Sequence, residues 1–279
     1  MTTIGRGRSA SGGLRPRPMI TSVLGVPTFT GPDGLTLHFR TWGEPGDRPT
    51  VVLHHGFGAD ARIDWEDSGV VAALLADGRH VVAPDARGHG ASEKPHDPAR
   101  YGEARMAADV RALADHVGLA AFDLVGYSMG GIVSLLVAVD EPRVRRLVVG
   151  GIGEGVVRSG GVDQRVLRSS ALAAALRADD PGVLADPVVR AFRAFADATG
   201  SDRLALAAQA DAVHARSIDL AAIAVPALVL AGTSDPLATR PEELARAIPG
   251  AEVRLVPGDH GGTLRRPEFA RAIIEFLGR

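Results

Sequence analysis

Five residues, Gly126-Tyr127-Ser128-Met129-Gly130, form a G-x-S-x-G pattern that is typical of a nucleophilic serine. They follow a strand expected at 122–126 and precede a helical pattern that extends to about residue 139. A turn from strand into helix strains the backbone at its centre, so small neighbours are needed there. The turn also lifts the hydroxyl out at the carboxyl edge of a sheet, beside the positive end of the helix dipole. We therefore predict Ser128 as the nucleophile, although a turn used only for packing would have the same sequence.

A serine nucleophile needs a general base and a group that orients this base, because its hydroxyl is weakly nucleophilic near neutral pH. His260 and Asp235 each lie in a loop after an expected strand, where parallel strands collect their functional residues. The order Ser, acid, His also fits this type of turn. We predict His260 as general base and Asp235 as orienting acid. Asp259 and Glu154 are the rival acids, and Asp235 could instead cap a turn.

An oxyanion formed on the substrate needs two hydrogen-bond donors. The backbone N–H of Met129, at the start of the helix, is the first expected donor, and that of Phe57 in the loop 55–58 is the second. An ordinary turn at the end of a strand is the structural alternative for this loop. Apolar side chains that we expect to contact the substrate, but that could also be core, are those of Phe57, Trp65, Met129, Phe192 and Phe195.

The remaining histidine and glycine clusters do not predict a metal or a cofactor. His54 and His55 are adjacent, so on a strand they point to opposite faces, and no metal-binding spacing accompanies them. We expect His55 to be structural and to fix the neighbouring loop. The glycine-rich loop 85–92 lacks the dinucleotide-binding pattern. We expect its Asp85 and Arg87 to bond the backbone and each other.

Composition limits the classes of function. The chain has 279 residues, of which 46% are hydrophobic and 23% charged, so a full-sized core can form. A net charge of −2 gives no basic surface for nucleic acid. The absence of cysteine excludes disulfides, thiolate metal sites and a cysteine nucleophile, and it fits a cytoplasmic location. No apolar run is long enough for a membrane span or a secretory signal, and residues 1–18 are expected to form a disordered tail.

Strands and helices alternate along most of the chain, which predicts βαβ units and a mostly parallel sheet with helices on both faces. Extended segments are expected at 20–29 and 35–41, and helices at 65–77 and 103–117. The alternation stops over 151–224, which has helical spacing and no run typical of a strand. We expect a core formed by 19–150 and 225–279, with 151–224 inserted as a helical cap. The apolar stripe of the helix at 103–117 comprises Met106, Val110, Leu113 and Val117.

Taken together, these motifs resemble those of the serine α/β-hydrolase family over nearly the whole chain after the tail. The segments that carry the resemblance are 55–57, 85–92, 126–131, 232–235 and 258–260. The resemblance implies the α/β-hydrolase fold, with an eight-stranded sheet and a helical cap after the sixth strand. Ser128 stands where similar epoxide hydrolases and haloalkane dehalogenases have Asp, so those reactions are disfavoured. Gly261 after His260 disfavours carbon–carbon bond hydrolases without excluding them.

We therefore expect a serine hydrolase that cleaves a small-molecule ester or lactone through an acyl-enzyme, without a cofactor. Two alternatives stay open. One is a carbon–carbon bond hydrolase, or a lyase or synthase, that uses the same three residues. The other is a ligand-binding member of the fold without turnover. No nucleic-acid or membrane partner is predicted, and a homodimer is compatible with the sequence.

Overall fold

The computed structural model describes residues 27–180 and 185–279. The expected tail at 1–18 and the start of the expected strand at 20–29 lie outside these residues. Eight strands of the described chain form one sheet in the order β1-β2-β4-β3-β5-β6-β7-β8. Strand β2 runs antiparallel to β1 and β4, and each pair of neighbours from β4 to β8 is parallel. The predicted fold, with its mostly parallel sheet, is confirmed.

The strands have three to seven residues, and the helices of the core have seven to fourteen. The strands are β1 (Thr28–Thr30), β2 (Thr36–Trp42), β3 (Thr50–His54), β4 (Val81–Pro84), β5 (Phe122–Tyr127), β6 (Val144–Gly150), β7 (Ala227–Gly232) and β8 (Glu252–Val256). The helices of the core are α1 (Val70–Ala76), α2 (Glu103–His116), α3 (Met129–Ala138), α8 (Pro241–Ala247) and α9 (Pro267–Leu277). A π-helical turn, η1 (Arg62–Glu66), occupies the start of the helix expected at 65–77.

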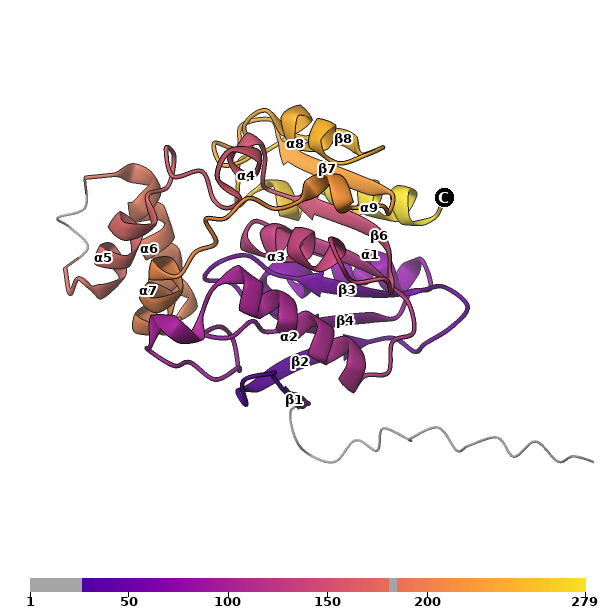
Figure 1. Ribbon diagram of the computed structural model, residues 1–279, viewed down its shortest axis with the longest axis horizontal. Coiled ribbons are helices and arrows are strands. Elements are labelled where there is room, and N and C mark those ends of the chain that lie inside the picture. Colours follow the sequence, from indigo (N-terminus) through magenta and orange to yellow (C-terminus); the bar gives the residue numbers. More distant parts are fainter. Residues whose placement is uncertain (1–26, 181–184) are drawn as a thin grey trace, which may run out of the picture.

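Two apolar layers cover the two faces of the sheet. In β3, Val52 packs on one layer with α2, α3 and α8, whereas Val51 and Leu53 pack on the other with α1 and α9. This alternation follows from the two-residue period of a strand. Because both faces of β3 are buried, its successive residues are mostly apolar. Figure 1 shows α2 and α3 in front of the sheet.

The segment inserted between β6 and β7 is helical, and we refer to residues 151–224 as the cap segment. It contains α4 (Glu154–Ser159), α5 (Ser169–Arg177), α6 (Pro187–Thr199) and α7 (Arg203–Asp211). Helices α5, α6 and α7 lie together beside the sheet (Figure 1) and share a small apolar core, against which Phe57 also packs. Asp186 and Asp202 begin α6 and α7 by accepting hydrogen bonds from backbone N–H groups of the first turn. Among the described residues, no helix has the length and apolar character that a membrane span requires.

The loop after β4 differs from what the sequence predicts for Asp85 and Arg87. Asp85 accepts hydrogen bonds from the N–H groups of Ala61 and Ala91 and contacts Nδ1 of His38 at 2.8 Å. Arg87 is instead held by the carboxylates of Asp109 and Asp33. Within the described residues Asp85 and Arg87 do not bond each other. A buried guanidinium needs carboxylate partners, and the Arg87 side chain reaches those on α2 and on the β1–β2 turn.

Candidate active site

The turn between β5 and α3 places Ser128 in a backbone conformation that few non-glycine residues adopt. Its φ is 54° and its ψ is −118°. The turn is so tight that there is no room for a side chain at its glycines. A Cβ on Gly126 would lie 2.1 Å from the carbonyl oxygen of Gly130, and one on Gly130 would lie 2.0 Å from that of His54. Glycine is therefore required on both sides of the serine, as the sequence pattern predicts.

His260 joins Ser128 to Asp235 by hydrogen bonds. Its Nε2 lies 2.9 Å from Oγ of Ser128, and its Nδ1 lies 2.9 and 3.0 Å from the two carboxylate oxygens of Asp235. The Asp235 side chain is fully buried, whereas that of His260 is 20% exposed. The structure thus brings together the three side chains that the sequence predicts as catalytic, from loops after β5, β7 and β8.

Backbone contacts hold the loops of Asp235 and His260 in place. The Tyr127 hydroxyl donates a 2.5 Å hydrogen bond to the carbonyl oxygen of His260. The N–H of Leu237 donates to Oδ1 of Asp235 at 2.9 Å, and that of Ser234 donates to the Gly258 carbonyl at 2.9 Å. Each loop is therefore fixed by its neighbour, which reduces the number of orientations open to the imidazole.

The two rival acids are engaged elsewhere. Asp259 accepts a hydrogen bond from the N–H of Gly262 at 2.7 Å and caps its own loop. Glu154 is paired with Arg240, Arg165 and Arg158. Hydrogen bonds from these arginines, of which that from Arg240 has the largest effect, lower the pKa of the Glu154 carboxyl to about 2. The geometry therefore selects Asp235 as the carboxylate that can orient His260.

The loop after β3 passes directly beside the nucleophile. A Cβ on Gly56 would lie 3.3 Å from Cβ of Ser128. Nδ1 of His55 lies 2.8 Å from the Gly56 carbonyl oxygen, and its Nε2 accepts a hydrogen bond from Ala86 at 2.9 Å. Burial lowers the pKa of His55 to about 4, so the ring is neutral and can donate at one nitrogen and accept at the other. His55 therefore fixes the loop that carries Phe57.

Asp64 is a site residue that the sequence reasoning missed. It lies in the turn η1 and accepts a hydrogen bond from the N–H of Gly56 at Oδ2, at 2.7 Å. Burial raises the pKa of this carboxyl to about 6, against the opposing effects of the Gly56 hydrogen bond and His260. An acid directly before the helix expected at 65–77 has the sequence of an ordinary exposed residue. No signal in the sequence distinguishes it.

Two pockets are both lined by Ser128. The inner pocket measures about 50 Å³ and includes Ser128, Met129 and Phe192 in its lining. The outer pocket measures about 510 Å³ and includes Ser128, His260 and Asp64. Phe57 and Phe192 line both pockets, and Phe195 lines the outer one. Four of the five expected substrate contacts therefore face a pocket.

Trp65 is the exception among the expected substrate contacts. Its side chain is fully buried and packs in the layer formed with α1 and α9, and it lines neither pocket. Successive side chains on a helical turn point in different directions, so Asp64 lines the outer pocket while Trp65 lies in the core. The expectation for Trp65 is wrong for this reason.

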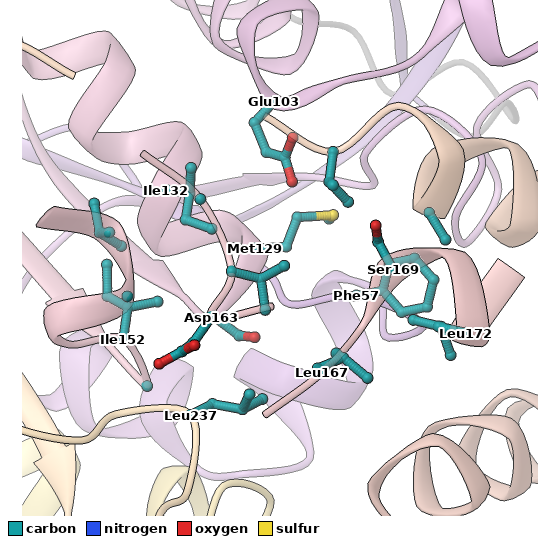
Figure 2. A pocket seen from close by; sticks show the side chains of 18 of the residues that line it. Phe57, Glu103, Met129, Ile132, Ile152, Asp163, Leu167, Ser169, Leu172 and Leu237 are labelled. Atoms are coloured by element: carbon teal, nitrogen blue, oxygen red, sulfur yellow. The ribbon is translucent and has the colours of Figure 1, made fainter. Parts of the chain in front are cut away.

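Glu103 is a second residue that the sequence reasoning missed. It begins α2, is 3% exposed, and lines the inner pocket. Figure 2 shows its carboxyl group directed into that pocket, on the side of Met129. The sequence does contain a signal for it. Glu103 lies three residues before Met106 and seven before Val110, so it continues the apolar stripe of this helix as a charged residue at a buried position.

Comparisons with known proteins agree with this geometry. A model of the α/β-hydrolase fold matches residues 49–156. A protein named as the carbamate hydrolase RutD of Variovorax paradoxus is 32% identical over 270 residues, which cover 88% of this chain and 97% of that one. The chain belongs to the α/β-hydrolase family.

Two further relatives of this α/β-hydrolase are named as lactonases. The 3-oxoadipate enol-lactonase 2 of Acinetobacter baylyi is 27% identical over 267 residues, covering 90% of this chain and 97% of that protein. The crystal structure of an enol-lactonase from Burkholderia xenovorans has a TM-score of 0.75 and 28% identity, and it covers 91% of this chain and 100% of its own. The relatives of this α/β-hydrolase are thus hydrolytic enzymes, and the predicted resemblance is confirmed.

Proposed function

We propose that this α/β-hydrolase cleaves a small carboxylic ester or lactone through an acyl-enzyme formed on Ser128. The observation that carries the proposal is the continuous hydrogen-bonded line from Ser128 through His260 to Asp235, with both steps near 2.9 Å. This geometry allows a proton to leave the serine oxygen as it attacks a carbonyl carbon. The names of the two lactonase relatives support the class of substrate.

In the proposed reaction, His260 takes the proton of Ser128 and then gives it to the leaving alcohol. Asp235 stays ionised, holds Nδ1–H of the ring and stabilises the imidazolium. The backbone N–H groups of Phe57 and Met129 are the proposed donors to the oxyanion. Water then attacks the acyl carbon as His260 removes its proton, and His260 returns this proton to Oγ of Ser128 as the acyl group leaves as a carboxylic acid.

We place one half of the substrate in each of the two pockets. His260 lines the outer pocket and not the inner one. Because the leaving alcohol must receive its proton from His260, it belongs in the outer pocket, and the acyl group belongs in the inner pocket. The inner pocket of about 50 Å³ is much smaller than the outer pocket of about 510 Å³, so the acyl group is expected to be the smaller half of the substrate.

The proposal is tested with a panel of short aryl and methyl esters and lactones, together with a fluorophosphonate probe. We expect turnover of short acyl esters, a covalent label located on Ser128 by mass spectrometry, and loss of both in Ser128→Ala. A label on any other residue, or unchanged turnover in Ser128→Ala, would contradict the proposed mechanism. A carbon–carbon bond substrate hydrolysed faster than every ester and lactone would change the reaction class.

A further inference from the structure

The inner pocket is lined mostly by apolar side chains, and one of its two acids has no cationic partner among the described residues. The apolar lining residues are Phe57, Met129, Ile132, Ile152, Leu167 and Leu172, with further Val and Leu side chains. Two acidic side chains, Asp163 and Glu103, also reach the lining. Asp163 is paired with Arg165 at 2.6 Å, so its charge is compensated. Glu103 therefore decides the electrostatic character of the pocket.

Glu103 has no cationic partner among the residues that the structure describes. Oε2 accepts a hydrogen bond of 2.6 Å from the backbone N–H of His214, which follows α7 in the cap segment. Burial raises the pKa of the Glu103 carboxyl to about 7, because a charged carboxylate is poorly stabilised in apolar surroundings. Near neutral pH much of it is thus a neutral acid, which has one O–H donor and further acceptor sites.

A buried acid in an apolar pocket lowers stability unless something repays the cost of its desolvation. The backbone N–H groups of His214 and of Glu103 itself both use this carboxyl group as an acceptor, so the O–H of the neutral acid is left without an acceptor among the described residues. A ligand that carries its own hydrogen-bonding group would satisfy the remaining capacity. The carboxyl group faces the space that the proposed function gives to the acyl half of the substrate (Figure 2).

We propose that Glu103 is a specificity-determining residue that hydrogen-bonds a hydroxyl group on a short acyl chain bound to Ser128. The inference rests on the proposed function, since it uses the assignment of the acyl group to the inner pocket. A hydroxyl both donates and accepts, as does a carboxylic acid, so the two are complementary. A carboxylate on the acyl chain is disfavoured by the same residue, because it would lie beside a buried acid with no cation to compensate it.

The test compares two methyl esters of the same shape, methyl 3-hydroxybutanoate and methyl 3-methylbutanoate, in which a hydroxyl replaces a methyl group. We expect the kcat/KM ratio of hydroxy to methyl ester to be on the order of tenfold in the natural protein. Glu103→Leu should reduce this ratio to about one or below. Glu103→Gln, which keeps a donor and an acceptor, should retain most of it. The ratio is informative because it cancels any general loss of activity.

A matched control separates substrate recognition from the structural role of Glu103 in holding the cap segment. Nε2 of His96 lies 2.9 Å from Asp202, and this contact also joins the core to the cap segment but lies outside both pockets. His96→Ala should change the rates of the two esters equally and leave their ratio unaltered. Monomethyl succinate supplies an anionic acyl group, and Glu103→Gln should raise its kcat/KM relative to methyl 3-methylbutanoate.

The outcomes distinguish this inference from the proposed function. If esters are hydrolysed but the hydroxy-to-methyl ratio is the same in the natural protein and in Glu103→Leu, the role of Glu103 is wrong and the hydrolase stands. An equal change of the ratio in His96→Ala would also overturn it, because the effect would then come from the cap segment. If no ester or lactone is hydrolysed, the proposed function fails and this inference fails with it.

Discussion

The N–H of Gly56 donates a 2.7 Å hydrogen bond to the carboxyl group of Asp64, which ties the loop beside the nucleophile to the turn that follows it. The bond holds Gly56 next to Ser128 and places a half-buried acid in the outer pocket beside His260. The cost of burying Asp64 opposes its ionisation and raises its pKa. The loop that carries the proposed oxyanion donor is therefore anchored by a group whose charge changes near pH 6.

Asp64 should make the protein less stable as the pH rises. Its pKa is raised from 3.8 to about 6 in the folded chain, so between these values the folded state keeps a proton that the unfolded state loses. The free energy of unfolding should fall by about 1–3 kcal/mol over this window, and stay lowered above it. Asp64→Asn should remove this loss, measured by urea unfolding at about pH 4 and about pH 8.

The control for Asp64 is Asp67, the acid that directly follows the same turn. Asp67 is 42% exposed and pairs with Arg62 at the surface. Asp67→Asn should leave the difference between the two pH values nearly unchanged, because an exposed carboxyl loses little solvation on folding. If Asp64→Asn and Asp67→Asn behave alike, burial of Asp64 does not control the pH dependence.

Replacing Asp235 should identify the acid that orients His260. Asp235→Asn keeps the shape of the side chain but removes the charge that stabilises the imidazolium and selects its tautomer, so kcat on a short ester should fall by about 10⁴-fold. Asp259→Asn and Glu154→Gln should change kcat by less than about threefold. Steady-state kinetics decides between them. A loss in Asp259→Asn as large as that in Asp235→Asn would disprove the assignment.

Tyr127 should affect catalysis through the position of His260. Tyr127→Phe removes the hydrogen bond to the His260 carbonyl, and we expect kcat/KM to fall by about fivefold, the equivalent of about 1 kcal/mol. Tyr101 offers a matched control, because its hydroxyl also donates to a backbone carbonyl, that of Pro95, at 2.6 Å. Tyr101→Phe should lower the melting temperature about as much as Tyr127→Phe does, but without the loss in kcat/KM. Equal kinetic effects would mean that Tyr127 only stabilises the fold.

Two adjacent glycines in α3 should tolerate alanine very differently. A Cβ on Gly130 would meet the His54 carbonyl oxygen at 2.0 Å, which requires strand β3 or helix α3 to move. A Cβ on Gly131 would meet the Cδ1 atom of Ile152 at 3.0 Å, which a small side-chain shift relieves. Gly130→Ala should therefore fail to give folded protein, whereas Gly131→Ala should lose about 1–3 kcal/mol in denaturant unfolding. Equal stability of the two variants would contradict the tight approach of α3 to β3.

The sequence by itself predicted the sheet and the three residues Ser128, Asp235 and His260. Strands buried on both faces are mostly apolar, so runs such as those in β3 and β5 are visible without a structure. The glycines beside Ser128 are visible for a similar reason, since the turn leaves no space for a Cβ. The order of Ser128, Asp235 and His260 along the chain follows from the order in which strands reach one edge of the sheet.

Only the tertiary structure decided which charged residues face each other or a pocket. Asp64 and Trp65 are neighbours, yet one lines the outer pocket and the other lies in the core, because the packing of this turn against α1 and α9 decides which of its sides is covered. Arg87 is paired with Asp109 and not with Asp85, since partners are chosen by proximity in space. The sequence shows that Glu103 stands on a buried stripe. That this stripe ends at the pocket of Ser128 depends on how α2 packs against α3 and the cap segment, which local residue patterns do not specify.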